Sequence, residues 1–377
     1  MTQASWQFSA FDPNTGKTID FLDCPSQTQY TRRLDDYCDL SGQIKQPEDF
    51  FSVQPYSSGI QALRNGIPRF RGRVVEPFER GPRLRTFIAK DPFHNLYWRR
   101  VRKHVKYTDD PDEIAWNLIH LQNTYKDTGL RSGTDRAWGA NVTRRFQAGD
   151  IVSDEVKNLA LTNGEHFHFK INALYDESDP KAMAAFATFN RGLTLSAARF
   201  EFGGSTLENV EDYHIEYGQP INRATVIGER RAAREAIGKD AGDTGNCMVG
   251  VAKATPSKNP PITASYVAGD SEHDYGLWEE EYGGVNKPTS LAHLQGIAKT
   301  SLHPKPPRTI TVTPNDEAPA LFTDFDVGDR VYVRINDYDF TLTAWCTVWE
   351  VVIDIDEDSG QETISTISFI NPQDTSA

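Results

Sequence analysis

The sequence predicts a β-rich α+β protein built from several domains, and three observations lead to this prediction. Short stretches that alternate apolar and polar residues, cut by Gly and Pro, fill residues 1–105 and return over 308–372. Helical spacing of apolar residues is concentrated between them, in 106–190. The chain has 377 residues, which is too many for one simple core and enough for two to four domains.

Residues 1–105 are expected to form a small barrel or sandwich, because many short strands alternate with turn signals. Apolar residues at alternate positions predict that Trp6, Phe8 and Ala10 share one strand face. After a turn at 14–16, Ile19 and Phe21 are expected to continue it. The dipeptide Asn65-Gly66 predicts a tight turn. Residues 71–75 and 84–89 are expected to pair as neighbouring strands.

Residues 106–190 are expected to form a compact α+β domain. A first helix is predicted from Asp110 and Pro111, a cap and a first-turn proline, to a stop at Gly129. A second helix begins at Ser153 and ends at Gly164. A strand follows at once, with three apolar side chains on one face and three polar ones on the other: Phe167, Phe169 and Ile171 against His166, His168 and Lys170.

A third helix over 179–186 completes that domain. Residues 191–230 return to strands and are expected to start a second β domain, which 308–377 complete. Residues 231–307 between them are expected to be an irregular insertion, loop-rich to 287 and with a short helix at 290–302. The acidic turn 356–360 is expected to join the last two strands as a hairpin.

The charge balance excludes some partners and is unevenly placed along the chain. Lys and Arg number 40 and Asp and Glu 53, which gives a net charge of −13. This argues against specific nucleic-acid binding and against an anionic membrane face. A basic stretch nevertheless runs through 69–103: Arg69, Arg71, Arg73, Arg80, Arg83, Arg85, Arg99, Arg100, Arg102 and Lys103. It indicates either a solvated sheet face or a surface for head-to-tail assembly with an acidic neighbour.

The four cysteines form no C-x-x-C pair, so we expect buried thiols rather than a zinc or redox motif: Cys24, Cys38, Cys247 and Cys346. The N-terminus lacks the basic and apolar regions of a signal peptide, and no apolar run approaches the roughly 20 residues that span a bilayer. We therefore expect the protein to be made and folded in a cytoplasm.

Motifs for catalysis, cofactors and metals are weak throughout. The nearest phosphate-binding loop, ending at Gly238-Lys239, fails because Ala233 and Asp240 stand where a glycine and a hydroxyl are needed. The pair His166 and His168 could begin a metal site but is expected to be an exposed polar face. We predict no catalytic residue, no cofactor and no metal ligand.

Two acidic runs are either candidate cation sites or solvated patches. Residues 354–360 resemble the start of a calcium loop, but Ser359 stands sixth where an EF-hand needs glycine, and Ser365 stands twelfth where it needs glutamate. An ordinary acidic turn is the expected outcome. The run 279–281 is expected to be a solvated patch.

Four stretches of the chain resemble, in their order, the minor tail proteins of siphophages that act as baseplate or tail-tip hubs. The stretches are Phe70–Val75 with Ala89–Pro92; the helix Asp112–Ile119; the strand Asn222–Gly228; and the ending Asp326–Val333, Val348–Asp356 and Gly360–Ile364. The resemblance covers roughly residues 65–370. Residues 229–287 have no counterpart in it.

This resemblance implies two related β-barrel domains with two smaller inserted domains. It implies a homotrimer, whose ring would join the tail tube to tip and receptor-binding proteins and let DNA pass during ejection. Distal tail proteins, other tail-tip proteins and the tape measure protein are the implied partners, and the virion tail tip is the implied location. The acidic excess would then help line a lumen to which DNA does not stick.

Two other function classes stay open. A tail-associated cell-wall hydrolase could use acids brought together only in the fold. A receptor- or glycan-binding module could use tryptophans as stacking surfaces: Trp98, Trp116, Trp138, Trp278, Trp345 and Trp349. The loop 266–287, with Tyr266, Tyr275, Trp278 and Tyr282 among acids, is the best aromatic candidate, and contact with a neighbouring tail protein is its expected role.

Overall fold

The computed structural model describes most of the chain, in these segments: 5–45, 52–81, 84–133, 142–161, 167–190, 195–204, 207–217, 223–228, 248–252, 262–267, 279–285, 308–338 and 340–370. The chain divides into two compact units. Unit 1 consists of Met1–Ala160, Phe167–Tyr213 and Thr311–Phe369; unit 2 consists of Leu161–His166, His214–Ile310 and Ile370–Ala377. No helix in the described segments is long and apolar enough to cross a membrane.

One large sheet dominates the structure and confirms the β-rich fold class. Among the described residues it has 13 strands, ordered β14-β19-β22-β21-β3-β4-β7-β6-β5-β1-β2, with β20 and then β13 branching from β21. The path is open at both ends, so closed barrels stay a prediction. The N-terminal strands are β1 (Trp6–Phe11), β2 (Thr18–Leu22), β3 (Ser26–Arg33), β4 (Asp39–Ile44), β5 (Gly59–Arg64), β6 (Ile67–Arg80) and β7 (Arg85–Lys90). The later strands are β13 (Leu195–Phe202), β14 (Val210–Tyr217), β19 (Arg308–Pro314), β20 (Arg330–Asp337), β21 (Phe340–Ile355) and β22 (Glu362–Ile370).

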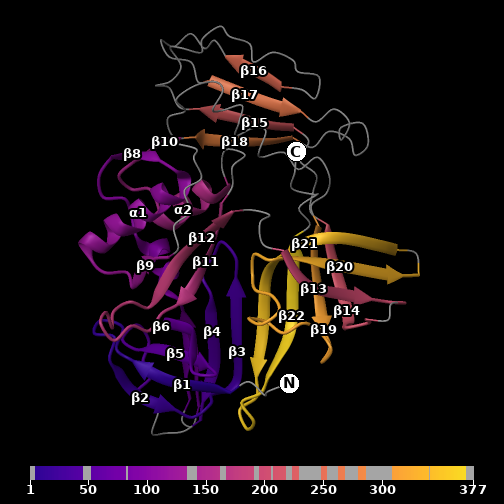
Figure 1. The fold of residues 1–377 in the computed structure, drawn as a ribbon. Coiled ribbons are helices and arrows are strands. Elements are labelled where there is room, and N and C mark those ends of the chain that lie inside the picture. Colours follow the sequence, from indigo (N-terminus) through magenta and orange to yellow (C-terminus); the bar gives the residue numbers. More distant parts are fainter. Residues whose placement is uncertain are drawn as a thin grey trace. The chain divides into compact units, whose positions relative to one another are not determined.

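The long strand β21 connects the N-terminal and C-terminal β regions. Its residues 340–347 pair antiparallel with β20, and its residues 350–355 pair antiparallel with β3. Figure 1 accordingly shows the yellow C-terminal strands beside the indigo strand β3. The last segment of the chain therefore completes the sheet that the first segment begins.

Local turn signals in the N-terminal region are confirmed. Asn65 and Gly66 both have positive φ, 52° and 77°, as the tight turn between β5 and β6 requires. Strands β6 and β7 pair antiparallel as expected. The prediction that Ile19 and Phe21 continue the face of Phe8 and Ala10 was wrong. The register pairs Phe8 with Leu22 and Ala10 with Asp20, so Ile19 and Phe21 lie on the other face of β2, where they are 52% and 79% exposed.

The α+β part of unit 1 packs around its own core (Figure 1). Its elements are η2 (Pro92–Trp98), β8 (Val105–Asp109), α1 (Pro111–Tyr125), β9 (Leu130–Ser132), β10 (Val142–Phe146), α2 (Val152–Leu161), β11 (Phe167–Ala173) and β12 (Ala184–Asn190). Helix α1 begins as predicted, with Asp110 as N-cap and Pro111 in the first turn. Ile114 and Leu118 on α1, Phe169 on β11 and Phe93 on η2 are fully buried in this core.

The predicted third helix was wrong. Residues 184–190 form β12, which pairs antiparallel with β11 and parallel with the short strand β9. Ala184, Ala185 and Phe186 are all buried, as in a strand that is covered on both faces, although their local preference indicated a helix. Hydrogen bonds to two neighbouring strands outweigh that weak preference.

Unit 2 contains a smaller sheet with the order β16-β17-β15-β18. Its strands are β15 (Arg223–Gly228), β16 (Met248–Ala252), β17 (Ile262–Val267) and β18 (Glu279–Val285). Three of these strands lie in the region for which only loops were expected. The helix predicted at 290–302 lies outside the described residues.

Candidate functional site

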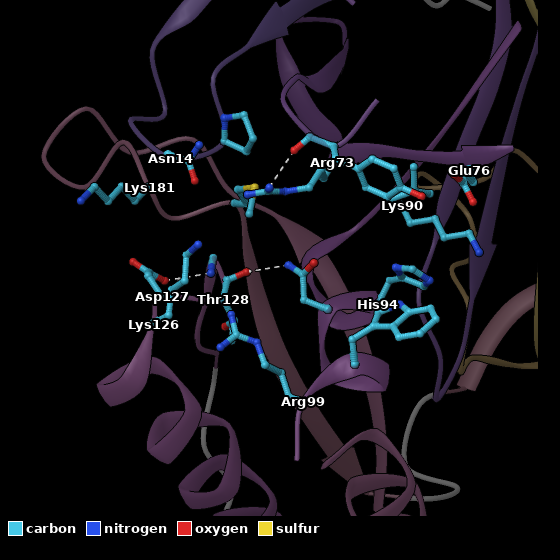
Figure 2. Close-up of a pocket in the computed structure, with 17 residues that line it drawn as sticks. Asn14, Arg73, Glu76, Lys90, His94, Arg99, Lys126, Asp127, Thr128 and Lys181 are labelled. Atoms are coloured by element: carbon cyan, nitrogen blue, oxygen red, sulfur yellow. Dashed lines mark hydrogen bonds between the residues drawn. The ribbon is translucent and has the colours of Figure 1, made fainter. Parts of the chain in front are cut away.

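A pocket of about 820 Å³ lies in unit 1, where the turn after β1 meets β6, η2 and the segment after α1 (Figure 2). It is lined by Pro13, Asn14, Tyr56, Arg73, Val75, Glu76, Lys90, His94, Asn95, Trp98, Arg99, Lys126, Asp127, Thr128, Gly129, Lys181 and Met183. Its volume lies in the range of sites that hold a small molecule. Six separate stretches of sequence therefore meet around one cavity: 13–14, 56, 73–76, 90–99, 126–129 and 181–183.

Capping of the short helix η2 positions one wall of the pocket. The carboxylate of Asp91 accepts hydrogen bonds from the backbone N–H of Phe93 at 2.8 Å and from that of Cys38 at 2.6 Å. These bonds fix where the helix starts, and Trp98 and Arg99 lie at the C-terminal end of the helix. Burial raises the pKa of Asp91 to about 7, although both hydrogen bonds act in the opposite direction.

A glycine and an amide network position the opposite wall. Gly129 has a φ of +88°, a conformation that a larger residue adopts only with strain. An added Cβ would also lie 2.2 Å from Cε of Met183, so the end of that side chain would have to shift. The side chain of Asn95 donates to the carbonyl of Thr128 at 3.1 Å (Figure 2). This bond ties η2 to the segment that follows α1.

Cations outnumber anions in the lining. The lining contains two carboxylates, Glu76 and Asp127, and five cationic side chains: Arg73, Lys90, Arg99, Lys126 and Lys181. The carboxylate of Asp127 is already engaged, because the guanidinium of Arg131 donates to both of its oxygens at 2.9 Å. In a chain with a net charge of −13, this is a local reversal of sign.

Burial lowers the pKa of three basic groups in the pocket, and only the histidine among them loses its charge at neutral pH. Burial lowers the pKa of Arg73, with Asp12 opposing and Arg99 reinforcing the shift, and it lowers the pKa of Arg99. Both guanidinium groups remain charged, because their ordinary pKa is far above neutral. Burial and the nearby charge of Lys90 lower the pKa of His94 to about 4, so its ring is neutral at pH 7.

The basic stretch 69–103 divides between the interior and the surface. Arg71 and Arg85 are buried at 1% and 8% exposure. The guanidinium of Arg71 donates to the carbonyls of Ala182 and Gly16 at 2.7 and 2.9 Å, so it holds segments together. Arg73 and Arg99 line the pocket, while Arg100 and Arg102 are exposed. The stretch is therefore not one uniform solvated face.

The expected exposed histidine face was wrong for the residue that the structure describes. His168 is 8% exposed, and its Nδ1 lies 2.6 Å from Oδ2 of Asp35. The other oxygen of Asp35 accepts from the backbone N–H of Phe169 at 2.7 Å. His168 therefore joins β11 to the end of β3, and His166 lies outside the described residues.

The acidic turn joins β21 and β22 as expected. Oδ1 of Asp356 accepts from the backbone N–H and the hydroxyl of Ser359 at 2.8 and 2.7 Å, so it holds the turn itself. Across the described residues, no three His, Cys, Asp or Glu side chains gather as metal ligands would. The run 279–281 forms part of β18.

The remaining candidates are scattered. Cys38 and Cys346 are buried as predicted, Cys24 is half-buried, and Cys247 lies outside the described residues. Trp98 is 78% exposed at the pocket. Trp116 and Trp349 are half-buried and Trp345 is exposed; Trp138, Trp278 and Tyr275 lie outside the described residues. Tyr266 and Tyr282 belong to β17 and β18.

The pocket combines residues that the sequence marked with others that it did not. Arg73 and Arg99 belong to the basic stretch, and Trp98 was a stacking candidate. Lys126 and Lys181 were missed, because they lie in two turns far from that stretch in sequence. A search for basic residues beside helix and strand ends would have marked both.

No protein-family model and no curated protein matches the sequence. The fold is similar to that of the tail protein from Neisseria meningitidis MC58, with a TM-score of 0.57, 11% identity and 98% of each chain covered. It is similar to that of the 43 kDa tail protein of prophage MuSo2 from Shewanella oneidensis, with 0.55, 14% and 98% of each chain. A prophage tail protein from Listeria monocytogenes EGD-e gives 0.56 and 9%, with 97% of this chain and 94% of that chain covered. The chain therefore has the fold of these phage tail proteins.

Proposed function

We propose that this chain is a structural subunit of a bacteriophage tail tip, where it forms the central hub ring. One observation carries the proposal: the fold matches tail proteins over 98% of both chains in two cases. A likeness confined to one small β module would be common to many functions. A likeness over the whole length includes the inserted parts as well, and this supports a shared role.

The proposed assembly is a homotrimer between the tail tube and the tip or receptor-binding proteins. Residues 1–105 would supply one barrel-like module, and 308–377 with those strands of 191–230 that join the large sheet would supply the other, so that three chains present six similar modules. Among the described strands β2 has a neighbour on one side only, and this supports such contacts, because an unpaired strand edge offers N–H and C=O groups to another chain. Distal tail proteins and the tape measure protein are the proposed neighbours.

A cryo-EM reconstruction of the native particle without imposed symmetry tests this proposal. The particles released from the strain that encodes the chain would be purified, and the presence of the chain checked by mass spectrometry. We expect a threefold ring at the tip, continuous with the tail tube. A chain absent from purified particles, or present as a single copy on the outer surface, would refute the hub.

The proposal assigns DNA passage to the ring and no catalytic role to the chain. Acids that face the lumen in the reconstruction can be changed to lysine, which should slow DNA ejection because lysine attracts the phosphates. Unchanged ejection would remove the electrostatic part of the proposal. A zymogram on cell-wall substrate tests the absence of catalysis, and a clearing band from the purified chain would contradict it.

A further inference from the structure

The pocket beside η2 contains positive charge that the described residues leave uncompensated. The guanidinium of Arg99 and the ammonium group of Lys126 have no ion pair within the described residues. The charge of Lys181 helps to lower the pKa of Asp127, but that carboxylate is already paired with Arg131. Asp12 is the acid whose charge acts to raise the pKa of Arg73. Its carboxylate oxygens are already engaged, because they accept from the backbone N–H of Asn14 and from the hydroxyl of Thr15, both at 2.8 Å. Like charges held together without a counterion favour binding of an anion.

Arg73 gives a second, independent sign of a missing partner. One of its terminal nitrogens donates to the carbonyl of Tyr56 at 2.8 Å. Its Nε is buried and has no hydrogen-bond partner among the described residues. A buried donor without an acceptor costs free energy, and an acceptor oxygen of a ligand in the pocket would satisfy it. Figure 2 shows Arg73 and Arg99 reaching the same cavity from opposite sides.

The remaining lining narrows the class of ligand. Trp98 and Tyr56, 78% and 52% exposed, provide flat rings at the pocket. Asn14, Asn95 and Thr128 add neutral polar groups. A flat ring packs against the C–H face of a sugar, while amides and hydroxyls bond its hydroxyl groups. Guanidinium groups match phosphate or carboxylate oxygens in geometry as well as in charge.

We infer that this pocket binds an acidic saccharide, meaning a sugar unit that carries a phosphate or carboxylate group. Arg73 and Arg99 hold the acidic group, and Trp98 packs on the sugar ring. A cavity of about 820 Å³ is far larger than one free oxyanion needs, which favours a ligand of sugar size. The inference does not depend on the hub proposal, since a monomer contains the whole pocket.

Isothermal titration calorimetry on the full chain tests the inference with five probes: glucose 6-phosphate, glucuronate, glucose, inorganic phosphate and hexaglutamate. We expect saturable binding of at least one acidic sugar, about tenfold tighter than that of glucose or of phosphate. The acidic sugar that binds more tightly shows whether the site prefers a phosphate or a carboxylate group.

Three variants locate the binding. Arg99→Gln should weaken binding of the acidic sugar about tenfold, whereas Arg100→Gln, an exposed neighbour outside the pocket, should change it by less than about twofold. Trp98→Ala should weaken binding of the sugar and leave that of inorganic phosphate unchanged. Arg73 is left intact, because its substitution could disturb β6.

Four outcomes would overturn the inference. They are no saturable binding of either acidic sugar; inorganic phosphate bound as tightly as the sugars; hexaglutamate bound more tightly than either sugar, which would indicate a site for an acidic protein segment; and equal effects of Arg99→Gln and Arg100→Gln. Circular dichroism of each variant verifies that the fold is retained.

Discussion

Arg32 and Asp326, which are 294 positions apart, form a two-bond ion pair inside unit 1. Nε of Arg32 lies 2.5 Å from Oδ1 of Asp326, and a terminal nitrogen lies 2.9 Å from Oδ2. Lys170 donates to Asp326 at 2.9 Å, and Arg32 also donates to Asn172 at 2.9 Å. One carboxylate therefore connects β3, β11 and the segment that leads into β20.

Asp326→Asn should lower the free energy of unfolding by about 3–5 kcal/mol, because it leaves the buried guanidinium of Arg32 without its counter-charge. Urea unfolding followed by tryptophan fluorescence measures this. Glu357→Gln is the matched control, since it breaks the exposed pair with Lys45 and should cost less than about 1 kcal/mol. Similar losses in both variants would show that burial does not determine how much an ion pair stabilises the fold.

The pair of Arg32 and Asp326 should make the free energy of unfolding depend on pH. Burial alone would raise the pKa of Asp326, but Arg32 and Lys170 outweigh burial and hold that pKa well below its usual range. A lowered pKa stabilises the fold above the unfolded pKa of 3.8, and this stabilisation is lost as the pH falls below it. We expect the difference between wild type and Asp326→Asn to shrink between pH 5 and the acid limit, as measured by unfolding at each pH. A constant difference would contradict this.

Glu155 should give the opposite dependence. Burial and the nearby charge of Asp150 raise its pKa to about 7, against the pull of Arg144. A raised pKa favours the fold below the unfolded value of 4.5, and the benefit is lost as the pH rises through about 7. Glu155→Gln should equal wild type at low pH and exceed its stability by about 1 kcal/mol at pH 8, after allowance for solvent screening. Glu177→Gln, an exposed control, should show no such trend in thermal unfolding.

Gly328 should be intolerant of a side chain for two separate reasons. Its φ is +87°, and an added Cβ would lie 2.3 Å from Cζ of Phe189. Gly66 has a similar φ of +77° with nothing within 4 Å. Gly66→Ala should therefore cost only the backbone strain, about 1 kcal/mol, and Gly328→Ala about 3 kcal/mol by chemical denaturation. Equal costs would mean that Phe189 moves aside freely.

Phe21 should matter to assembly rather than to folding. It is 79% exposed on the edge strand β2, so Phe21→Lys should change unfolding by less than about 0.5 kcal/mol. The new charge on an open edge should oppose pairing with a second chain and lower the trimer fraction in light scattering. Thr18→Lys, an exposed change on the same strand, measures the effect of charge alone. A trimer unaffected by Phe21→Lys would place the contact elsewhere.

The residue types alone were enough to predict the features that short-range rules control. Asp110 and Pro111 start α1, Asn65-Gly66 closes a hairpin, and the acidic turn 356–360 joins the last two strands. Each depends on backbone geometry or on hydrogen bonds within a few residues, so the residue types suffice to predict it. The order of apolar patterns likewise predicted a β-rich chain with α+β material between its two β regions.

Tertiary structure decided the features that depend on distant partners. His168 is buried beside Asp35, 133 positions earlier, which provides its hydrogen bond. Phe21 is exposed because the register with β1 places Leu22, and not Phe21, opposite Phe8. Residues 184–190 form a strand because β11 and β9 lie beside them. The pocket also exists only after six segments come together. In each case the deciding free energy comes from contacts between residues far apart in sequence, which a local pattern does not record.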